Sequence, residues 1–322
     1  AAMRMLTVSK NEAGQRLDKL LAKYLNLAGK SFIYKMMRKK NITLNGKKCD
    51  GSEHLTEGDE IKLFLAEETI EKFSEVKIQK VQKKKLDIVY EDEHILLINK
   101  PSGMLSQKAK ETDESLVEYL IDYLLDSGKL KKEDLACFRP SVCNRLDRNT
   151  SGLVIAGKNI HALQAMNEII RKRDVRKIYT ALVYGEMKGK GKLEGYLKKD
   201  HEDNQVRLVK KSEDAQHIEI LYEAEETYRK EGITFTRVEI ELLTGRSHQI
   251  RVQMAGKGHP LLGDKKYGTK ESIEASRELG IKRQMLHAGL LSFPAFEEGF
   301  EGVSGKSFRA PLPEDMEKLI QK

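Results

Sequence analysis

The segment on which the interpretation of this chain depends reads Asn144-Arg145-Leu146-Asp147-Arg148-Asn149-Thr150-Ser151-Gly152-Leu153. One carboxylate stands between two arginines, and the short polar residues and glycine after it favour a tight turn into a strand at Leu153. An exposed ion pair in a surface loop would explain this pattern and would contribute little stability. The functional alternative is a carboxylate that nearby cations keep ionised, ready to act as nucleophile or base.

The composition indicates a folded and basic chain. Its 322 residues suffice for one large domain or two unequal ones, and 39% hydrophobic residues allow a sizeable core. Lysine and arginine total 58 against 50 acidic residues, which gives a net charge of +8. A basic surplus favours a polyanionic partner, because each neutralised phosphate releases counterions.

The cysteines Cys49, Cys137 and Cys143 are odd in number and lack CxxC spacing, so they predict neither a disulfide framework nor a zinc site. A reducing, cytoplasmic setting is the simplest interpretation. No apolar stretch approaches the roughly 20 residues of a membrane helix, and no secretory leader is visible. We therefore expect no membrane attachment, and we also expect a monomer.

Common cofactor signatures are missing from the sequence. Gly29-Lys30-Ser31 imitates the end of a phosphate-binding loop, but Tyr24 stands where the leading glycine belongs. No GxGxxG follows a strand, no HExxH occurs, and the eight histidines do not pair at ligand spacing. We expect neither a nucleotide cofactor nor a bound metal.

Residues 14–65 predict a compact α+β unit. Leucines recur at helical spacing from Leu17 to Leu25, Ser31 is a candidate cap for a second helix, and Asn45-Gly46 predicts a hairpin turn. Basic residues surround the second helix, and a solvated helix face would explain them on charge alone. The members of this group used below are Lys35, Arg38, Lys39 and Lys40.

The order of these elements resembles the S4 RNA-binding domain. The resemblance rests on the pattern Arg16-Leu17-Asp18, Ser31, Asn45-Gly46 and Gly58-Asp59. It implies that the second helix and the turn after it form a basic surface that contacts structured RNA.

Residues 66–85 are charge-rich and predict a connector, in which residues 73–80 alternate weakly, as part of a strand would. Residues 86–322 predict a second domain. We expect strands at 86–90, 95–98, 152–156, 177–184, 218–223 and 234–243, and helices at 115–125 and 160–171. Because helices do not regularly separate these strands, we expect an α+β domain with a mostly antiparallel sheet.

Three further polar segments stand at or near the ends of predicted strands. Polar residues at strand ends often form sites, although loops are polar in any case. Taken alone, Tyr179 would more often be a core or interface tyrosine than a catalytic one. The segments are Asn99-Lys100-Pro101-Ser102-Gly103, Arg176-Lys177-Ile178-Tyr179 and Thr244-Gly245-Arg246-Ser247-His248-Gln249-Ile250-Arg251.

Together with residues 145–152, Gly263-Asp264 and Leu286-His287-Ala288, these segments resemble the RluA-type pseudouridine synthases. The resemblance implies a large mixed, mainly antiparallel sheet with a central cleft. It also implies isomerisation of specific uridines to pseudouridine in structured RNA, without a cofactor. The stretch between Tyr267 and Leu286, with the preceding S4-like domain, is most like the subgroup that acts on 23S-type ribosomal RNA of the large subunit.

The resemblance assigns the essential carboxylate to Asp147, which would attack C1′ or C6 or remove a ribose proton. Arg251 is its expected salt-bridge partner, and Arg246 is the competing candidate. Tyr179 would stack on the target base and assist proton removal from C5, and Arg145 would fill the space left by the flipped nucleotide. Arg148 and Arg246 are expected to contact RNA.

Two rival functions are considered. The first is a noncatalytic RNA-binding or ribosome assembly factor with an S4 domain, against which the intact segment 145–152 argues. The second is a hydrolase that uses Asp147 or Ser151 with His248, but Ser151 lacks a GxSxG elbow and an orienting acid. His248 and His259 are expected to orient loops rather than to catalyse.

Overall fold

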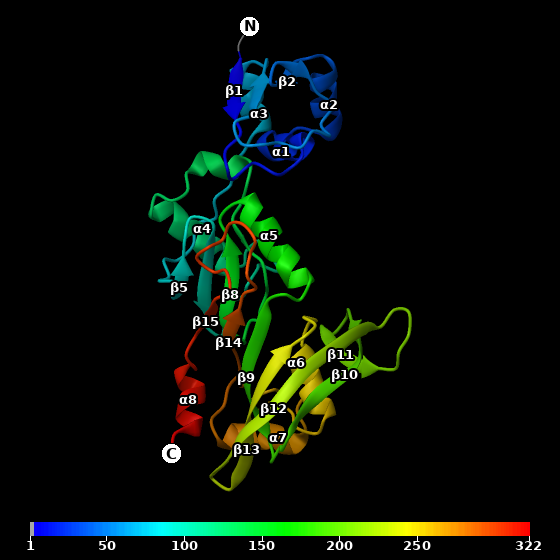
Figure 1. The fold of residues 1–322 in the computed structure, drawn as a ribbon, viewed down its shortest axis with the longest axis vertical. Coiled ribbons are helices and arrows are strands. Elements are labelled where there is room, and N and C mark those ends of the chain that lie inside the picture. Colours follow the sequence, from blue (N-terminus) through cyan, green and yellow to red (C-terminus); the bar gives the residue numbers. More distant parts are fainter. Residues whose placement is uncertain (1–2) are drawn as a thin grey trace.

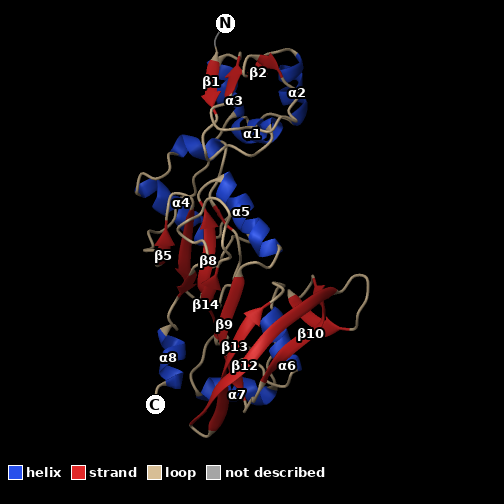
Figure 2. Ribbon diagram, in the orientation of Figure 1, coloured by secondary structure: helices blue, strands red, loops and turns tan. Residues whose placement is uncertain are grey.

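The computed structural model describes residues 3–322 and contains two sheets, each with its own helices (Figures 1 and 2). A four-stranded sheet near the N-terminus precedes a sheet of 11 strands. None of the helices within residues 3–322 has the length and hydropathy needed to cross a bilayer.

The small sheet has the strand order β1-β4-β2-β3, and its neighbouring strands are antiparallel. Asn45 and Gly46 both have positive φ and form the predicted two-residue turn between β2 and β3. Leu17, Leu20 and Leu21 are fully buried in this unit's own core. Its elements are β1 (Arg4–Thr7), α1 (Leu17–Tyr24), α2 (Lys30–Arg38), β2 (Ile42–Leu44), β3 (Lys47–Lys48), β4 (Glu60–Leu63) and α3 (Glu67–Phe73).

Two details of this region differ from the expectations. Gly29 is the N-cap of α2, so Ser31 lies inside the first turn instead of capping it. Part of the expected connector forms α3, whose Ile70 is fully buried in the core of the N-terminal unit. Residues 74–87 form no strand; Val76 and Val81 instead pack against the core of the second domain, which accounts for the weak alternation.

The large sheet has the order β11-β10-β12-β13-β9-β14-β8-β6-β5, with β7 and β15 at its margins. Only the β8–β14 pair is parallel among the pairs of residues 3–322, so the expected mixed, mainly antiparallel sheet is confirmed. The elements are β5 (Ile88–Glu91), β6 (Ile95–Lys100), α4 (Leu116–Asp126), the 3-10 helix η1 (Lys132–Ala136), β7 (Ser141–Val142), β8 (Ser151–Gly157), α5 (Ile160–Arg171), β9 (Arg176–Tyr184), β10 (Lys190–Asp200), β11 (Gln205–Val209), β12 (Gln216–Lys230), β13 (Ile233–Leu242), α6 (Gln249–Gly256), α7 (Lys270–Glu278), β14 (Leu286–Ser292), β15 (Ser307–Arg309) and α8 (Glu314–Ile320).

The continuous apolar runs of β6 and β8 reflect burial on both faces of the sheet. On one face, Leu96 and Ile98 share a core with Leu120 of α4. On the other face, Ile95 and Leu97 of the same strand share a core with residues of α5. The end of β8 that begins at residue 151 is therefore firmly placed.

The short parallel contact between β8 and β14 joins the two halves of the sheet. It consists of the registered pairs Ser151–His287 and Ala288–Gly152. Gly152 has φ +129°, and a Cβ atom there would overlap the backbone of Ala288, so glycine is required. The loop that carries Asp147 therefore enters the sheet at the junction of its two halves.

Candidate active site

Asp147 lies in the loop between β7 and β8, and hydrogen bonds fix the backbone of this loop at four consecutive carbonyl groups. The donors come from separate parts of the domain, so the direction of the Asp147 side chain is set by the surrounding fold. The carbonyls of Leu146, Asp147, Arg148 and Asn149 accept from Ser106 Oγ (2.9 Å), the Thr150 amide (3.0 Å), Lys100 Nζ (3.0 Å) and Arg283 Nη1 (3.0 Å), respectively.

Lys100, at the end of β6, is fully buried behind this loop. Its Nζ atom donates to the carbonyls of Pro101 at 2.9 Å, Met104 at 2.7 Å and Arg148 at 3.0 Å. An ammonium has three N–H donors, which these carbonyls satisfy. Burial lowers the pKa of Lys100 to about 7, although the charge of Asp147 opposes the shift. The sequence singled out the turn 99–103 but not this role.

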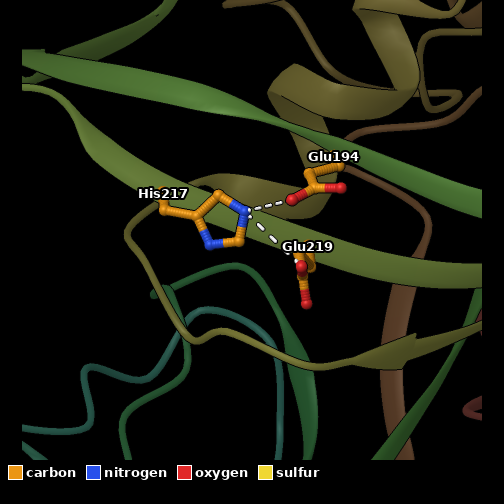
Figure 3. Close-up of side chains that lie close together, drawn as sticks. All are labelled: Glu194, His217 and Glu219. Atoms are coloured by element: carbon orange, nitrogen blue, oxygen red, sulfur yellow. Dashed lines mark hydrogen bonds and ion pairs between the residues drawn. The ribbon is translucent and has the colours of Figure 1, made fainter. Parts of the chain in front are cut away.

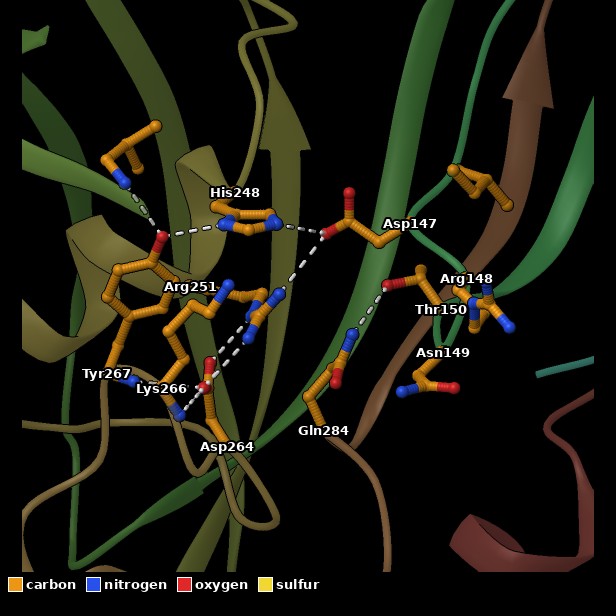
Figure 4. A network of polar contacts seen from close by, with 12 residues as sticks. Asp147, Arg148, Asn149, Thr150, His248, Arg251, Asp264, Lys266, Tyr267 and Gln284 are labelled. Carbon is orange, nitrogen blue, oxygen red and sulfur yellow. Dashed lines mark hydrogen bonds and ion pairs between the residues drawn. The ribbon is translucent and has the colours of Figure 1, made fainter. Parts of the chain in front are cut away.

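Arg251 of α6 is the arginine that reaches Asp147. Its Nη1 atom lies 3.6 Å from Oδ2 of Asp147, and Figure 4 shows the two side chains facing each other. The other nitrogens bind the buried Asp264, with Nε at 2.7 Å from Oδ2 and Nη2 at 3.0 Å from Oδ1. Arg246, the competing candidate, is exposed on the preceding turn.

His248 and Tyr267 complete this side of the site. His248 Nε2 lies 3.9 Å from Oδ2 of Asp147, and its Nδ1 lies 2.6 Å from the hydroxyl oxygen of Tyr267. Burial lowers the pKa of His248 even though Asp147 attracts a proton. The sequence analysis gave His248 no catalytic role and named Tyr267 only as the start of a stretch. Nineteen residues and a helix separate them, and no short-range pattern relates such positions.

Tyr179 is buried on β9, on the sheet face that also carries residues of α6. Burial, and then the negative charge of nearby Asp147, raise the pKa of its hydroxyl. The hydroxyl is therefore protonated at neutral pH. The structure thus brings together Asp147, Arg251 and Tyr179 from three distant segments.

The other predicted contacts are exposed basic residues in two groups. Arg145, Arg148 and Arg246 are exposed near the Asp147 loop, and Arg148 points away from Asp147 in Figure 4. The second group is exposed on and after α2 of the N-terminal unit, and it comprises Lys35, Arg38, Lys39 and Lys40.

Comparison with known proteins identifies this arrangement. The RNA pseudouridylate synthase family model matches residues 94–256, and the S4 domain model matches residues 15–61. The chain belongs to the RNA pseudouridylate synthase family. It is 32% identical to ribosomal large subunit pseudouridine synthase C of Pasteurella multocida (strain Pm70), over 99% of this chain and 93% of that protein.

Two further relatives support this assignment. An uncharacterized RNA pseudouridine synthase of Bacillus subtilis (strain 168) is 32% identical over 98% of this chain and 96% of its own length. The structure of human RNA pseudouridylate synthase domain containing 4 superposes with a TM-score of 0.56 and 22% identity, covering 71% of this chain and 89% of that one, which shows the same fold. The predicted family, enzyme class and likeness to synthase C are thus confirmed.

The geometry of this synthase does not provide the hydrolase pair considered from the sequence. Ser151 is buried, and its Oγ atom lies 2.8 Å from Nδ1 of His287 instead of facing His248. Arg283 Nη2 also donates to Ser151 Oγ, at 3.3 Å. These contacts tie β8 to β14 and leave Ser151 inaccessible as a nucleophile.

A separate cluster of possible metal ligands lies on the outer strands β10 and β12 (Figure 3). His217 Nε2 lies 2.7 Å from Glu194 Oε1 and 3.5 Å from Glu219 Oε1. Lys192 Nζ lies 3.2 Å from the same Glu219 oxygen. Since a lysine already neutralises Glu219, this cluster is an ion-pair network on the surface of the synthase.

Proposed function

We propose that this synthase isomerises uridines in large-subunit ribosomal RNA, with Asp147 as its catalytic carboxylate. The observation that carries the proposal is the convergence of Asp147, Arg251 and Tyr179 in one site. The choice of RNA is supported by the relatives that are named for the large ribosomal subunit.

The reaction breaks the C1′–N1 bond of uridine, turns the uracil and joins it again through C5. Asp147 acts by attack on C1′ or C6 or by removal of a ribose proton. Arg251 stabilises the ionised carboxylate, because an opposite charge nearby favours that form. Tyr179 stacks on the uracil; since its raised pKa keeps it protonated, it does not start the reaction as a base.

Uridine within folded RNA must leave its stack to reach Asp147, at a cost of about a few kcal/mol. Arg145 replaces the lost stacking, and Arg148 and Arg246 bind neighbouring backbone. The basic group on α2 supplies a second attachment point, which raises the effective concentration of RNA at the site. We further propose that the enzyme acts as a monomer in the cytoplasm, consistent with its three free cysteines.

Tritium release from RNA labelled at uridine C5 tests the substrate, because bond formation at C5 expels that hydrogen. Large-subunit ribosomal RNA, small-subunit ribosomal RNA and transfer RNA are compared as separate transcripts. We expect release from the large-subunit transcript. Release only from another RNA would overturn the substrate, and tight binding without release from any of them would favour the noncatalytic RNA-binding factor.

A further inference from the structure

The hydroxyl of Tyr267 connects His248 to the hairpin formed by β10 and β11. Its oxygen accepts a hydrogen bond from the backbone amide of Val206 at 3.0 Å and lies 2.6 Å from His248 Nδ1. On the other side of the imidazole, Nε2 lies 3.9 Å from Asp147 Oδ2. Figure 4 shows the imidazole between the tyrosine and the aspartate.

These contacts determine where the protons lie. A backbone amide can only donate, so Tyr267 accepts from Val206 and has its own hydroxyl proton left for His248. Nδ1 of His248 is then the acceptor, and the single ring proton of the neutral imidazole resides on Nε2. The opposite tautomer would turn a lone pair toward the carboxylate. The lowered pKa of His248 agrees with a neutral ring.

We propose that His248 is a positioning residue for Asp147, held by Tyr267 as the Nε2–H tautomer so that it donates to the carboxylate. Both His248 Nε2 and Arg251 Nη1 face the same oxygen, Oδ2. Oδ1 of Asp147 has no hydrogen-bond partner among residues 3–322, and it is the oxygen available to the nucleotide. The 3.9 Å separation shortens when RNA binds, as catalytic hydrogen bonds commonly do. This assignment rests on the proposed role of Asp147.

The backbone at His248 supports the assignment. His248 has φ +56° at the N-cap of α6, a left-handed conformation that non-glycine residues adopt at some cost. This conformation directs the ring between Tyr267 and Asp147. Tyr267 also orients the second donor, because the guanidinium carbon of Arg251 lies 5.1 Å from the centre of its ring. One tyrosine therefore aligns both groups that face Oδ2.

Nitrogen NMR of the full-length protein labelled with 15N-histidine tests the tautomer without any turnover. Two other histidines are internal standards, because carbonyl groups can only accept. His259 Nδ1 lies 2.9 Å from the Tyr184 carbonyl and must carry the proton, whereas His287 Nε2 lies 3.0 Å from the Ala310 carbonyl and must carry it there. The His248 signals are assigned as those lost in His248→Gln.

We expect His248 to show the Nε2–H pattern of His287, and to lose that preference in Tyr267→Phe while both standards stay unchanged. The pattern of His259, or no response to Tyr267→Phe, would overturn the proposal even if Asp147 proves essential. In turnover assays, Tyr267→Phe should lower kcat about tenfold, the effect of one lost charge-assisted hydrogen bond, with little change in KM. Tyr228→Phe, which removes a hydroxyl bound to exposed Glu226, is the matched control and should retain full activity.

Discussion

Arg251 presents Nη1 to Asp147 because Asp264 binds the other two nitrogen atoms of its guanidinium, at 2.7 and 3.0 Å. The side chain of Asp264 is fully buried, and its Oδ1 also accepts from the backbone amides of Lys266 and Tyr267. The carboxylate that sets the arginine is thus distinct from the carboxylate that the arginine serves.

Asp264→Asn should therefore impair both stability and catalysis. The change leaves the buried charge of Arg251 without its main partner, and breaking a buried pair costs about 3 kcal/mol or more. We expect a lower unfolding free energy in urea and a kcat reduced at least about tenfold. Glu274→Gln, which breaks an exposed pair with Arg277, is the control and should change neither quantity. Unchanged kcat in a folded Asp264→Asn protein would contradict this account of Arg251.

Lys100→Met should loosen the catalytic loop. The substitution fits a buried site but leaves the carbonyl of Met104 without its lysine donor and removes one of two donors to Arg148. An unsatisfied buried carbonyl costs about 1–3 kcal/mol, so we expect a loss of that size in denaturant titrations. Hydrogen exchange at residues 146–150 should accelerate in the variant. Exchange as slow as in the wild type would show that Lys100 does not hold this loop.

Glu91 on β5 makes stability depend on acid pH. Burial raises its pKa, but hydrogen bonds from Lys129, Lys158 and Tyr123 outweigh burial and lower it to about 2. The folded-state pKa lies below the ordinary value of 4.5, so this stabilisation is present above that pH and is lost as pH falls from 4.5 toward about 2. We expect the difference in Tm between wild type and Glu91→Gln to shrink across that window. A difference that stays constant with pH would contradict the assignment.

The basic group on α2 should govern RNA affinity rather than chemistry. Replacing Lys35, Arg38, Lys39 and Lys40 with alanine should raise KM and leave single-turnover rates at saturating RNA unchanged. The slope of log affinity against log salt should fall by about three, close to one unit per lost phosphate contact. Replacing Lys270 and Lys282, exposed at the opposite end of the molecule (Figure 1), is the control. An equal loss of affinity in both variants would show that charge alone, without a docking surface, explains binding.

The sequence predicted the elements with strong periodicity and missed those set by tertiary contacts. The double-faced burial of β6 and β8 was visible as apolar runs, and Asn45-Gly46 identified its turn. The helix α3 was missed because its charged residues hide a single anchoring side chain, Ile70. For a short helix, packing of one side chain outweighs pattern.

The site shows the same division. The arginine–aspartate segment around Asp147 was recognisable as a motif, whereas the choice between Arg246 and Arg251 depended on where α6 begins. That helix starts at Gln249, which leaves Arg246 on an exposed turn and places Arg251 inside the first turn of the helix. The role of Lys100 was also out of reach, since its acceptors are backbone atoms that only the folded loop brings together.

The central claim is that the ionised side chain of Asp147 performs the isomerisation. The most direct measurement is single-turnover tritium release from C5-labelled large-subunit ribosomal RNA by the wild type, Asp147→Asn and Asp147→Ala. Binding of the same RNA and thermal unfolding are measured in parallel to establish that the variants fold and bind. The account predicts wild-type release and no release above background from either variant, with RNA affinity retained. Release by a folded Asp147→Asn protein at a rate near that of the wild type would contradict it.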